Sequence, residues 1–214
     1  MEKRVSASGY GLCLFSADML QDFLKKNRIR KRKLLSLLQK DKELYLTSIK
    51  EGIWVPLAQI DYYAYAIRLE GQDQPFDSQW EQKIDYGGFN LEIRDGLWVS
   101  GISKLEPFEP DEYHIETGEV YKVSPLGQEF YHSPQERWYT VLNGWRDYTD
   151  IKYDVPAGKY HLSIKGYIRK EKVEAPEPNC GFYFSLTETE AFDGFKNPRE
   201  SDDYDFNVGN MRDK

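Results

Sequence analysis

One stretch decides the fold class of this chain: Phe89-Asn90-Leu91-Glu92-Ile93-Arg94-Asp95-Gly96-Leu97-Trp98-Val99-Ser100-Gly101-Ile102. Apolar and polar residues alternate through its first half, which is the period of a strand with one buried face. Asp95-Gly96 then supplies a two-residue turn of the type that needs a positive φ. The stretch predicts a β-hairpin with four residues on one buried face: Ile93 paired with Trp98, and Phe89 paired with Ile102.

A second hairpin is predicted between residues 151 and 168. Its two alternating strands flank a tight connection, Pro156-Ala157-Gly158-Lys159. The segment 155–160 resembles, over a short run of turn residues, the connection in various small bacterial β-proteins that include inhibitor and immunity proteins. Further strands are predicted at four places: 53–56, 62–69, 119–123 and 180–187.

The first quarter of the chain, over about 16–52, reads as helical. Apolar residues recur at helical spacing after Ser16, which is a suitable N-cap. Asp41 is placed to cap a third short helix, and Gly52 lies just past its end.

One more helix is predicted over 134–143. The residues Ser133-Pro134-Gln135-Glu136 have the form of a capping box with proline at the first helical position. Tyr139-Thr140-Val141 would equally suit a strand, so both assignments stay open at this point.

These patterns predict an α+β protein in a single domain, residues 1–214. An N-terminal helical layer, about 16–52, packs on an antiparallel β-sheet or β-sandwich that occupies about 53–196. A polar, acidic tail follows over about 197–214. A parallel doubly wound fold would need helices between successive strands, and beyond residue 53 only 134–143 supplies one.

The composition is that of a soluble, cytoplasmic protein. A net charge of −7 disfavours a general nucleic-acid binder, because such domains are usually basic. The mean hydropathy of −0.72 is low, yet 16 Tyr supply rings that can be buried at the edge of a core. Cys13 and Cys180 form no disulfide framework, and no segment reaches the ~20 apolar residues of a membrane helix. We therefore expect free thiols and no membrane contact.

A basic run, 25–33, contains seven Lys or Arg in nine residues. Such a run can contact phosphates of nucleic acid or of anionic lipid, or it can simply be a solvated helix face. It lacks interleaved aromatic residues, and the whole chain is acidic. These two facts favour the solvated face over nucleic-acid binding.

The segment 104–119 is an acidic loop with no basic residue after Lys104. A dense negative surface, here and in the tail at 199–205, can steer a basic partner into contact and repel nucleic acid. We therefore predict a non-catalytic protein that binds a basic protein, in the manner of an inhibitor or immunity protein. The predicted contact residues are four carboxylates and one aromatic anchor: Glu109, Asp111, Glu112, Glu116 and Tyr113.

Known catalytic and metal-binding motifs are absent from the sequence. There is no Gly-x-Ser-x-Gly, no phosphate-binding glycine loop and no Gly-x-Gly-x-x-Gly. His114 and Glu116 could place two ligands on one strand face, but a zinc site needs three or four. His132 and His161 stand apart from both cysteines. We assign no catalytic residue, no metal ligand and no cofactor, and no feature of the sequence sets an oligomeric state.

Two other functions compete with protein binding. An enzyme could assemble its site from scattered residues, and it would then show a concave pocket with convergent polar groups and perturbed ionisable residues. A carbohydrate-binding module would use exposed tryptophan rings. Trp80 and Trp145 lie near polar loops and are the best candidates for exposure.

Overall fold

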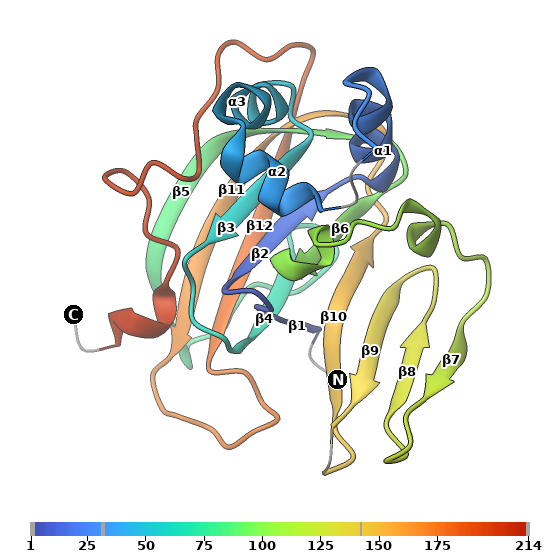
Figure 1. The fold of residues 1–214 in the computed structure, drawn as a ribbon. Coiled ribbons are helices and arrows are strands. Elements are labelled where there is room, and N and C mark those ends of the chain that lie inside the picture. Colours follow the sequence, from blue (N-terminus) through green and yellow to red (C-terminus); the bar gives the residue numbers. More distant parts are fainter. Residues whose placement is uncertain (1–2, 31–32, 142, 213–214) are drawn as a thin grey trace.

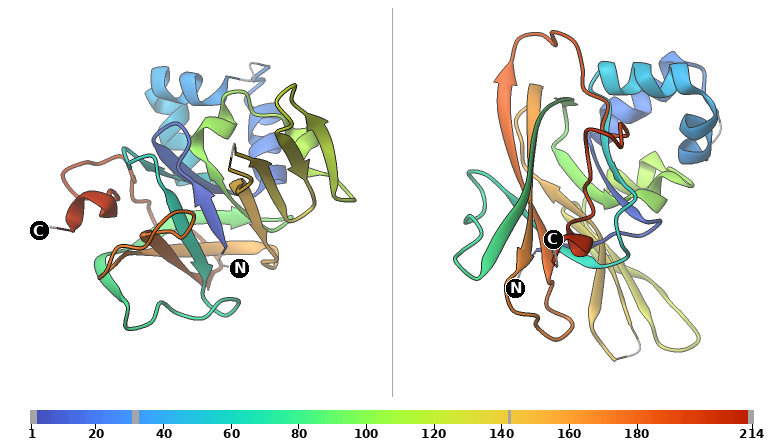
Figure 2. Two further views of the ribbon diagram at one scale, coloured as in Figure 1. Left: turned by 90° about the horizontal axis from the view of Figure 1, so that it is seen from below. Right: turned by 90° about the vertical axis from the view of Figure 1, so that its left-hand side faces the viewer.

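A computed structural model describes residues 3–30, 33–141 and 143–212. These residues form two β-sheets packed face to face, with a layer of helices outside one of them (Figure 1). The same layers are seen from below and from the left-hand side in Figure 2. The helices precede most of the strands, and most strand pairs are antiparallel, so the predicted α+β class is confirmed. No helix among the described residues combines the length and the apolar character needed to cross a membrane.

The smaller sheet contains three long, neighbouring strands. Its five strands, in spatial order, are β1 (Arg4–Ser6), β4 (Ala64–Leu69), β12 (Cys180–Thr189), β11 (Gly158–Arg169) and β5 (Trp80–Ile93). β11 pairs with β12 on one side and β5 on the other, over almost its whole length. β4 and β12 run parallel, and the remaining pairs are antiparallel.

The larger sheet extends well beyond the smaller one. Its seven strands, in spatial order, are β3 (Trp54–Ala58), β2 (Gly11–Phe15), β6 (Leu97–Gly101), β10 (Arg146–Tyr153), β9 (Glu136–Thr140), β8 (Glu129–His132) and β7 (Glu119–Val123). The last three strands form an arm, residues 119–140, which leaves the body of the protein on the right of Figure 1. The smaller sheet therefore covers only part of the larger one.

The main core lies between the two sheets. Both sheets contribute fully buried aromatic and aliphatic side chains, such as Leu14 and Val99 from the larger sheet and Phe182 and Phe184 from the smaller. The C-terminal tail also enters this core, because Phe206 and the residues of a 3₁₀ helix, η3 (Val208–Met211), pack there. The polar tail expected from the sequence is thus held by apolar residues up to Met211.

A second core lies between the helices and the outer face of the larger sheet. The layer consists of α1 (Ala17–Lys26), α2 (Leu34–Lys40) and α3 (Lys42–Lys50), together with the 3₁₀ helices η1 (Ile102–Leu105) and η2 (Pro110–Tyr113). Phe15, Trp54 and Trp98 point into it from three neighbouring strands. Asp41 accepts a hydrogen bond from the Leu44 amide (3.0 Å) and caps α3, as predicted.

The predicted hairpin at 89–102 is wrong. β5 and β6 belong to different sheets, so Phe89 and Ile93 lie in the core between the sheets, whereas Trp98 and Ile102 lie under the helices. The Asp95-Gly96 turn does form, with a φ of +99° at Gly96. It turns the chain from one sheet into the other rather than folding it back.

Two contacts explain this outcome. Asp95 accepts hydrogen bonds from the Ser16 hydroxyl and from the Asp18 amide (3.4 Å), which ties the turn to the start of α1. β6 is buried on both faces, between the main core and the helices. A strand that is buried on both faces has no polar side, so its alternation pattern says nothing about which strand it pairs with.

The second predicted hairpin, over 151–168, is also wrong. β10 lies in the larger sheet and β11 in the smaller, so the connection at 154–157 again crosses between sheets. The hairpin partner of β11 is the next strand, β12, beyond a longer loop. The turn residues therefore predicted the positions of both bends, at 95–96 and 154–157, correctly. The strand pairings predicted across those bends are wrong.

The helix predicted over 134–143 is a strand instead. Residues 136–140 form β9, and residue 142 lies outside the described part of the chain. The Ser133 hydroxyl accepts hydrogen bonds from the Gln135 and Glu136 amides (3.2 and 3.0 Å), so it does bind the following amides as a capping residue would. Here those bonds close the turn between β8 and β9.

Candidate functional site

The acidic loop, residues 104–119, connects the body of the protein to the arm. It includes η2 and leads directly into β7 (Figure 1). One side of the loop packs on the helices and on the larger sheet, and the other side faces solvent. The two sides differ in chemistry, and we describe them in turn.

Glu106 anchors the start of the loop to α2. Its carboxylate accepts hydrogen bonds from the amide (2.8 Å) and the hydroxyl (2.7 Å) of Ser36, in the first turn of that helix. Burial acts to raise the pKa of Glu106, but the Ser36 hydrogen bonds and the charge of Lys33 outweigh it, so the pKa is lowered. A carboxylate at this position satisfies free helix amides and complements the helix dipole. Glu106 is therefore occupied in holding the fold.

Phe108 and Tyr113 form the apolar underside of the loop. Their rings stack on each other at 5.5 Å, and Tyr113 also meets Phe15 (5.3 Å) and Trp98 (5.1 Å) edge-on. Tyr113 is 4% exposed. The expectation that Tyr113 presents its ring to a partner is therefore corrected, because the ring is already used by the protein's own core.

A buried pair of charges supports Tyr113 from below. The Arg137 guanidinium lies 3.9 Å from the Tyr113 ring centre and 3.6 Å from the Asp150 carboxylate, and both residues are almost fully buried. Tyr113 donates a hydrogen bond to Asp150 (3.4 Å), and Lys104 approaches the same carboxylate at 3.7 Å. Arg137 also donates to the Glu112 carbonyl, so β9 holds the backbone of the loop directly.

The ionised form of Asp150 is favoured by its neighbours. Burial acts to raise the pKa of this carboxyl group, but the charges of Lys104 and Arg137, with hydrogen bonds from Ser100 and Thr149, hold it below its usual value. The Asp150 carboxylate at the base of the loop thus attracts two cations, Lys104 and Arg137. The ion pairs hold the underside of the loop in place, although the Nε and Nη1 atoms of Arg137 are buried without a hydrogen-bond partner.

The outer side carries the predicted contact carboxylates. Asp111, Glu112 and Glu116 are exposed, and Glu109 is half-buried. Asp111 and Glu112 lie together on η2, which is pinned by Tyr113 and by the Glu112 carbonyl. From residue 105 to residue 121 the sequence has no Lys or Arg to neutralise them. The sequence thus identified the exposed acidic residues correctly but took the buried ring for an exposed one.

β7 continues this outer side and was not foreseen as part of a site. It is the last strand of its sheet as described, so its far edge is unpaired, and every one of its residues is exposed. Four apolar residues on β7 and the following turn are strongly exposed: Val120 (44%), Tyr121 (52%), Val123 (60%) and Leu126 (84%). A signal was present in the sequence, because Val120, Tyr121 and Val123 lie within four residues just before a Ser-Pro-Leu-Gly turn.

The histidines are distributed over the surface of this region. His114 lies 3.3 Å from Asp18, and His132 lies 3.2 Å from Glu119 and stacks on Tyr121. Asp18, Asp95 and His114 bring one possible metal-ligand atom each within 4.8 Å of one another. Sequence spacing could not reveal this group, because its members come from α1, a turn between sheets and the acidic loop.

A cavity of about 570 Å³ lies at the other end of the larger sheet, beneath the 172–179 loop. Trp145 borders it and is 39% exposed, as expected, whereas Trp80 is 6% exposed, so its expected exposure is wrong. Cys180 also borders it, and burial raises the pKa of this thiol to about 11. A thiol that stays protonated at neutral pH is a poor nucleophile, which argues against covalent catalysis by Cys180.

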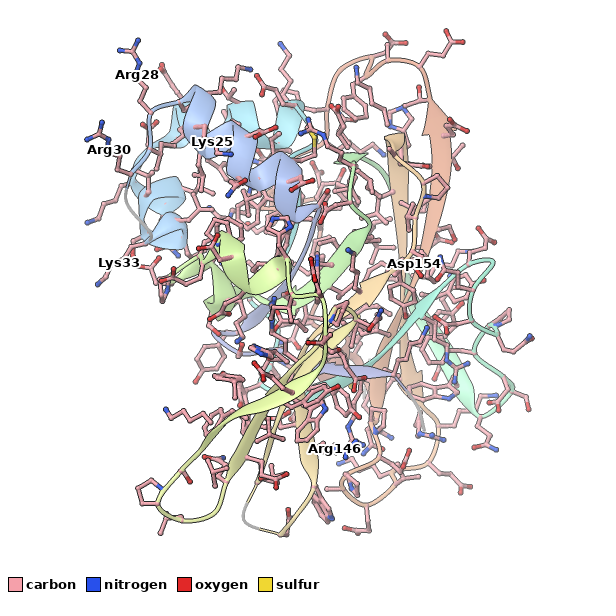
Figure 3. The ribbon with its side chains drawn as sticks, turned by 90° about the vertical axis from the view of Figure 1, so that its right-hand side faces the viewer. Lys25, Arg28, Arg30, Lys33, Arg146 and Asp154 are labelled. Carbon is pink, nitrogen blue, oxygen red and sulfur yellow. The ribbon has the colours of Figure 1, made fainter. Side chains whose placement is uncertain are left out.

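The basic run, 25–33, begins in the last turn of α1 and ends just before α2. Lys25 pairs with Asp22 (3.6 Å) and Lys26 with Glu51 (2.8 Å). Figure 3 shows Arg28, Arg30 and Lys33 pointing away from the protein. Residues 31–32 of the run lie outside the described part of the chain.

Comparison with known proteins gives no family for this chain. No protein-family model, no curated protein and no solved structure matches it. The function is therefore argued from the surfaces just described. The outer side of the acidic loop and the edge of β7 are continuous along the chain and both are exposed, and we call residues 109–126 the loop–edge surface.

Proposed function

We propose that this chain is a non-catalytic binding protein that captures a basic protein on the loop–edge surface, in the manner of an inhibitor or immunity protein. The observation that carries the proposal is the division of the acidic loop. Its buried side packs in the protein's own core, while the side chains of Asp111, Glu112 and Glu116 are exposed and form no ion pair with any described residue. They adjoin an open strand edge that carries exposed apolar side chains.

Charge supports a basic partner. The carboxylates of the loop–edge surface belong to a chain with a net charge of −7, and the surface has Lys122 as its single basic residue. Clustered charge of one sign raises the association rate with an oppositely charged protein by steering the encounter, and this effect weakens as salt increases. The same negative charge would repel nucleic acid from the occluded surface of the partner.

The edge of β7 supports a protein rather than a small cation. An unpaired strand edge offers a row of amide and carbonyl groups that an extended segment of another chain can bind. Val120, Tyr121 and Val123 are exposed along that strand and add apolar contact area. Charge would thus govern the encounter, and strand pairing with apolar contacts would retain the partner.

Rigid support makes the surface ready to bind. Glu106 fixes one end of the loop to α2, and Arg137 fixes η2 to β9. A loop that is already ordered loses little conformational entropy on association, which favours affinity. An ordered loop of this kind suits a binding surface. A loop whose charges served only to keep the protein hydrated would not have to be held in one conformation.

The direct test is capture from a lysate of the source cells at low and moderate salt, read by mass spectrometry. The wild type is compared with the variant D111N/E112Q/E116Q and with a matched control, E188Q/E190Q/D193N, which removes three exposed carboxylates elsewhere. We expect a dominant basic protein on the wild type and the control, weakened by salt and lost on the loop variant. Equal capture by all three proteins would refute the proposal.

A further inference from the structure

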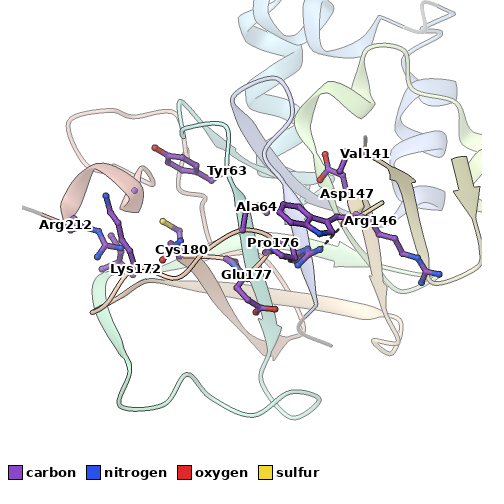
Figure 4. Close-up of a pocket in the computed structure, with 17 residues that line it drawn as sticks. Tyr63, Ala64, Val141, Arg146, Asp147, Lys172, Pro176, Glu177, Cys180 and Arg212 are labelled. Atoms are coloured by element: carbon purple, nitrogen blue, oxygen red, sulfur yellow. Dashed lines mark hydrogen bonds between the residues drawn. The ribbon is translucent and has the colours of Figure 1, made fainter. Parts of the chain in front are cut away.

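The cavity beneath the 172–179 loop is a second place where the protein can bind a molecule, distinct from the loop–edge surface. It lies between that loop, the start of β10, and the residues around η3 (Figure 4). Its volume of about 570 Å³ is within the roughly 300–1,000 Å³ of sites that hold small organic ligands. Its lining includes apolar side chains such as Ile168 and Pro176.

Arg4 fixes the walls of the cavity. Its guanidinium donates to the carbonyl of Pro176 (2.6 Å) in the loop and to the carbonyl of Arg146 (3.0 Å) at the start of β10. Arg4 is 6% exposed, so these bonds are shielded from water. The Asn179 side chain closes the loop further by bonding both the amide and the carbonyl of Val173 (2.9 Å each). The cavity is therefore preformed.

One end of the cavity is positively charged. Figure 4 shows Lys172 and Arg212 at the same end, next to Cys180. Neither cation forms an ion pair with a carboxylate of any described residue, and Arg212 donates a hydrogen bond to the Lys170 carbonyl (3.5 Å). Glu177 also borders the cavity, but its carboxylate is directed away from that end (Figure 4). Asp147 borders the cavity as well, but its carboxylate already accepts hydrogen bonds from the Ser6 and Tyr139 hydroxyls. An anion bound at the end with Lys172 and Arg212 would give both cations a partner that no described carboxylate supplies.

Trp145 supplies an aromatic surface to the same cavity. It is the exposed one among the five tryptophans, since Trp54, Trp80, Trp98 and Trp138 are each at most 6% exposed. A half-exposed indole can stack on a flat ring such as a nucleobase, and this contact stabilises the complex whichever base is bound. The Trp145 indole and the cations of Lys172 and Arg212 therefore border the same preformed cavity.

We propose that this cavity binds a small organic anion that carries a flat aromatic ring, of the mononucleotide class. The anionic group lies between Lys172 and Arg212, and the ring packs on Trp145. Binding here needs neither the acidic loop nor β7, so this inference stands or falls separately from the proposed function.

The test uses the quenching of Trp145 fluorescence and isothermal calorimetry with AMP, GMP, CMP and UMP. We expect at least one of them to bind with a Kd below about 1 mM. Adenosine, which has no phosphate, and ribose 5-phosphate, which has no ring, are expected to bind at least tenfold more weakly than AMP if AMP is the ligand. Substitution W145F should remove the fluorescence signal and leave calorimetric binding measurable.

Substitution of single lysine and arginine residues tests where in the cavity the anionic group binds. K172A and R212A should each weaken binding at least fivefold, whereas K170A, which removes an exposed lysine two residues before the loop and outside the cavity lining, should leave it unchanged. Equal melting temperatures will show that the variants are folded. The proposal is overturned if none of the four nucleotides binds at concentrations up to about 5 mM. It is also overturned if the phosphate-free or ring-free probe binds as tightly as the nucleotide, or if K172A and R212A bind like the wild type.

Discussion

The two sides of the acidic loop are built from neighbouring residues and have opposite properties. On the inner side, Tyr113 and Phe108 are buried against the core, and the charges of Arg137 and Asp150 neutralise each other. On the outer side, Asp111 and Glu112 are exposed with no basic residue near them in the sequence. A single turn of 3₁₀ helix, η2, contains members of both sets: Asp111 and Glu112 on the outer side and Tyr113 on the inner side.

This difference separates the residues that hold the fold from the residues that are free to bind. Burial and charge pairing on the inner side determine where the loop lies, and they leave the outer carboxylates without a structural task. A variant of an inner residue should therefore change stability. A variant of an outer residue should change binding and leave stability alone. The predictions below test this separation, beginning with the largest expected effect on stability.

The substitution D150A should destabilise the protein most. It removes the partner of Arg137 and Lys104 and leaves a buried guanidinium without its counter-charge. Breaking a buried pair in this way typically costs about 3–5 kcal/mol. Urea unfolding at neutral pH measures the change. A loss below about 1 kcal/mol would mean that the inner side does not hold the loop as described.

Acid should destabilise the wild type through the same carboxyl group. The folded-state pKa of Asp150 is lowered, because Lys104 and Arg137 outweigh the effect of burial. Its contribution to stability is therefore complete above the unfolded pKa of about 3.9 and is lost as the pH falls through the folded-state pKa. Unfolding free energies measured from pH 7 to about pH 2.5 should fall less steeply for D150N than for the wild type. Parallel curves would contradict this assignment.

The substitution E106A should have an intermediate effect. It removes the carboxylate that caps α2 through Ser36, and the loss of such a cap typically costs about 1 kcal/mol. E106Q keeps an acceptor oxygen and should recover part of the loss. Thermal unfolding of the three proteins tests this order, and an E106A protein as stable as the wild type would remove Glu106 from the inner set.

The substitution D111N/E112Q/E116Q should have the smallest effect on stability, within about 0.5 kcal/mol of the wild type. Removal of three like charges from one surface relieves repulsion slightly, so a small gain is as acceptable as no change. Urea unfolding beside the control E188Q/E190Q/D193N measures it. A loss above about 1 kcal/mol would show that the outer carboxylates do contribute to the fold.

The sequence predicted the secondary structure and the turns better than it predicted which strands pair with each other. The Asp95-Gly96 turn and the bend after Tyr153 both form, but each carries the chain between sheets. Turn residues determine local backbone direction, whereas pairing is decided by contacts across the whole fold. β11 pairs with β5 and β12, each over nearly its full length, and not with β10 as the sequence predicted. Nothing local to residues 89–102 contains that information.

The candidate site shows the same limit. The exposure of Asp111, Glu112 and Glu116 followed from their charge, because unpaired carboxylates are rarely buried. The burial of Tyr113 depended on Phe15 and Trp98, which are remote in sequence. An aromatic residue in an acidic loop can face either way, and only the tertiary structure decides which. The open edge of β7 likewise depends on the order of strands in the sheet.

The central claim is that the outer side binds and the inner side supports. It is tested most directly by association kinetics of the captured basic partner with immobilised wild type and D111N/E112Q/E116Q, at two salt concentrations, with the melting temperature of each protein measured in parallel. We expect the variant to associate about tenfold more slowly at low salt, with a smaller difference at high salt and an unchanged melting temperature. Equal association rates, or slower association accompanied by a lower melting temperature, would contradict the claim.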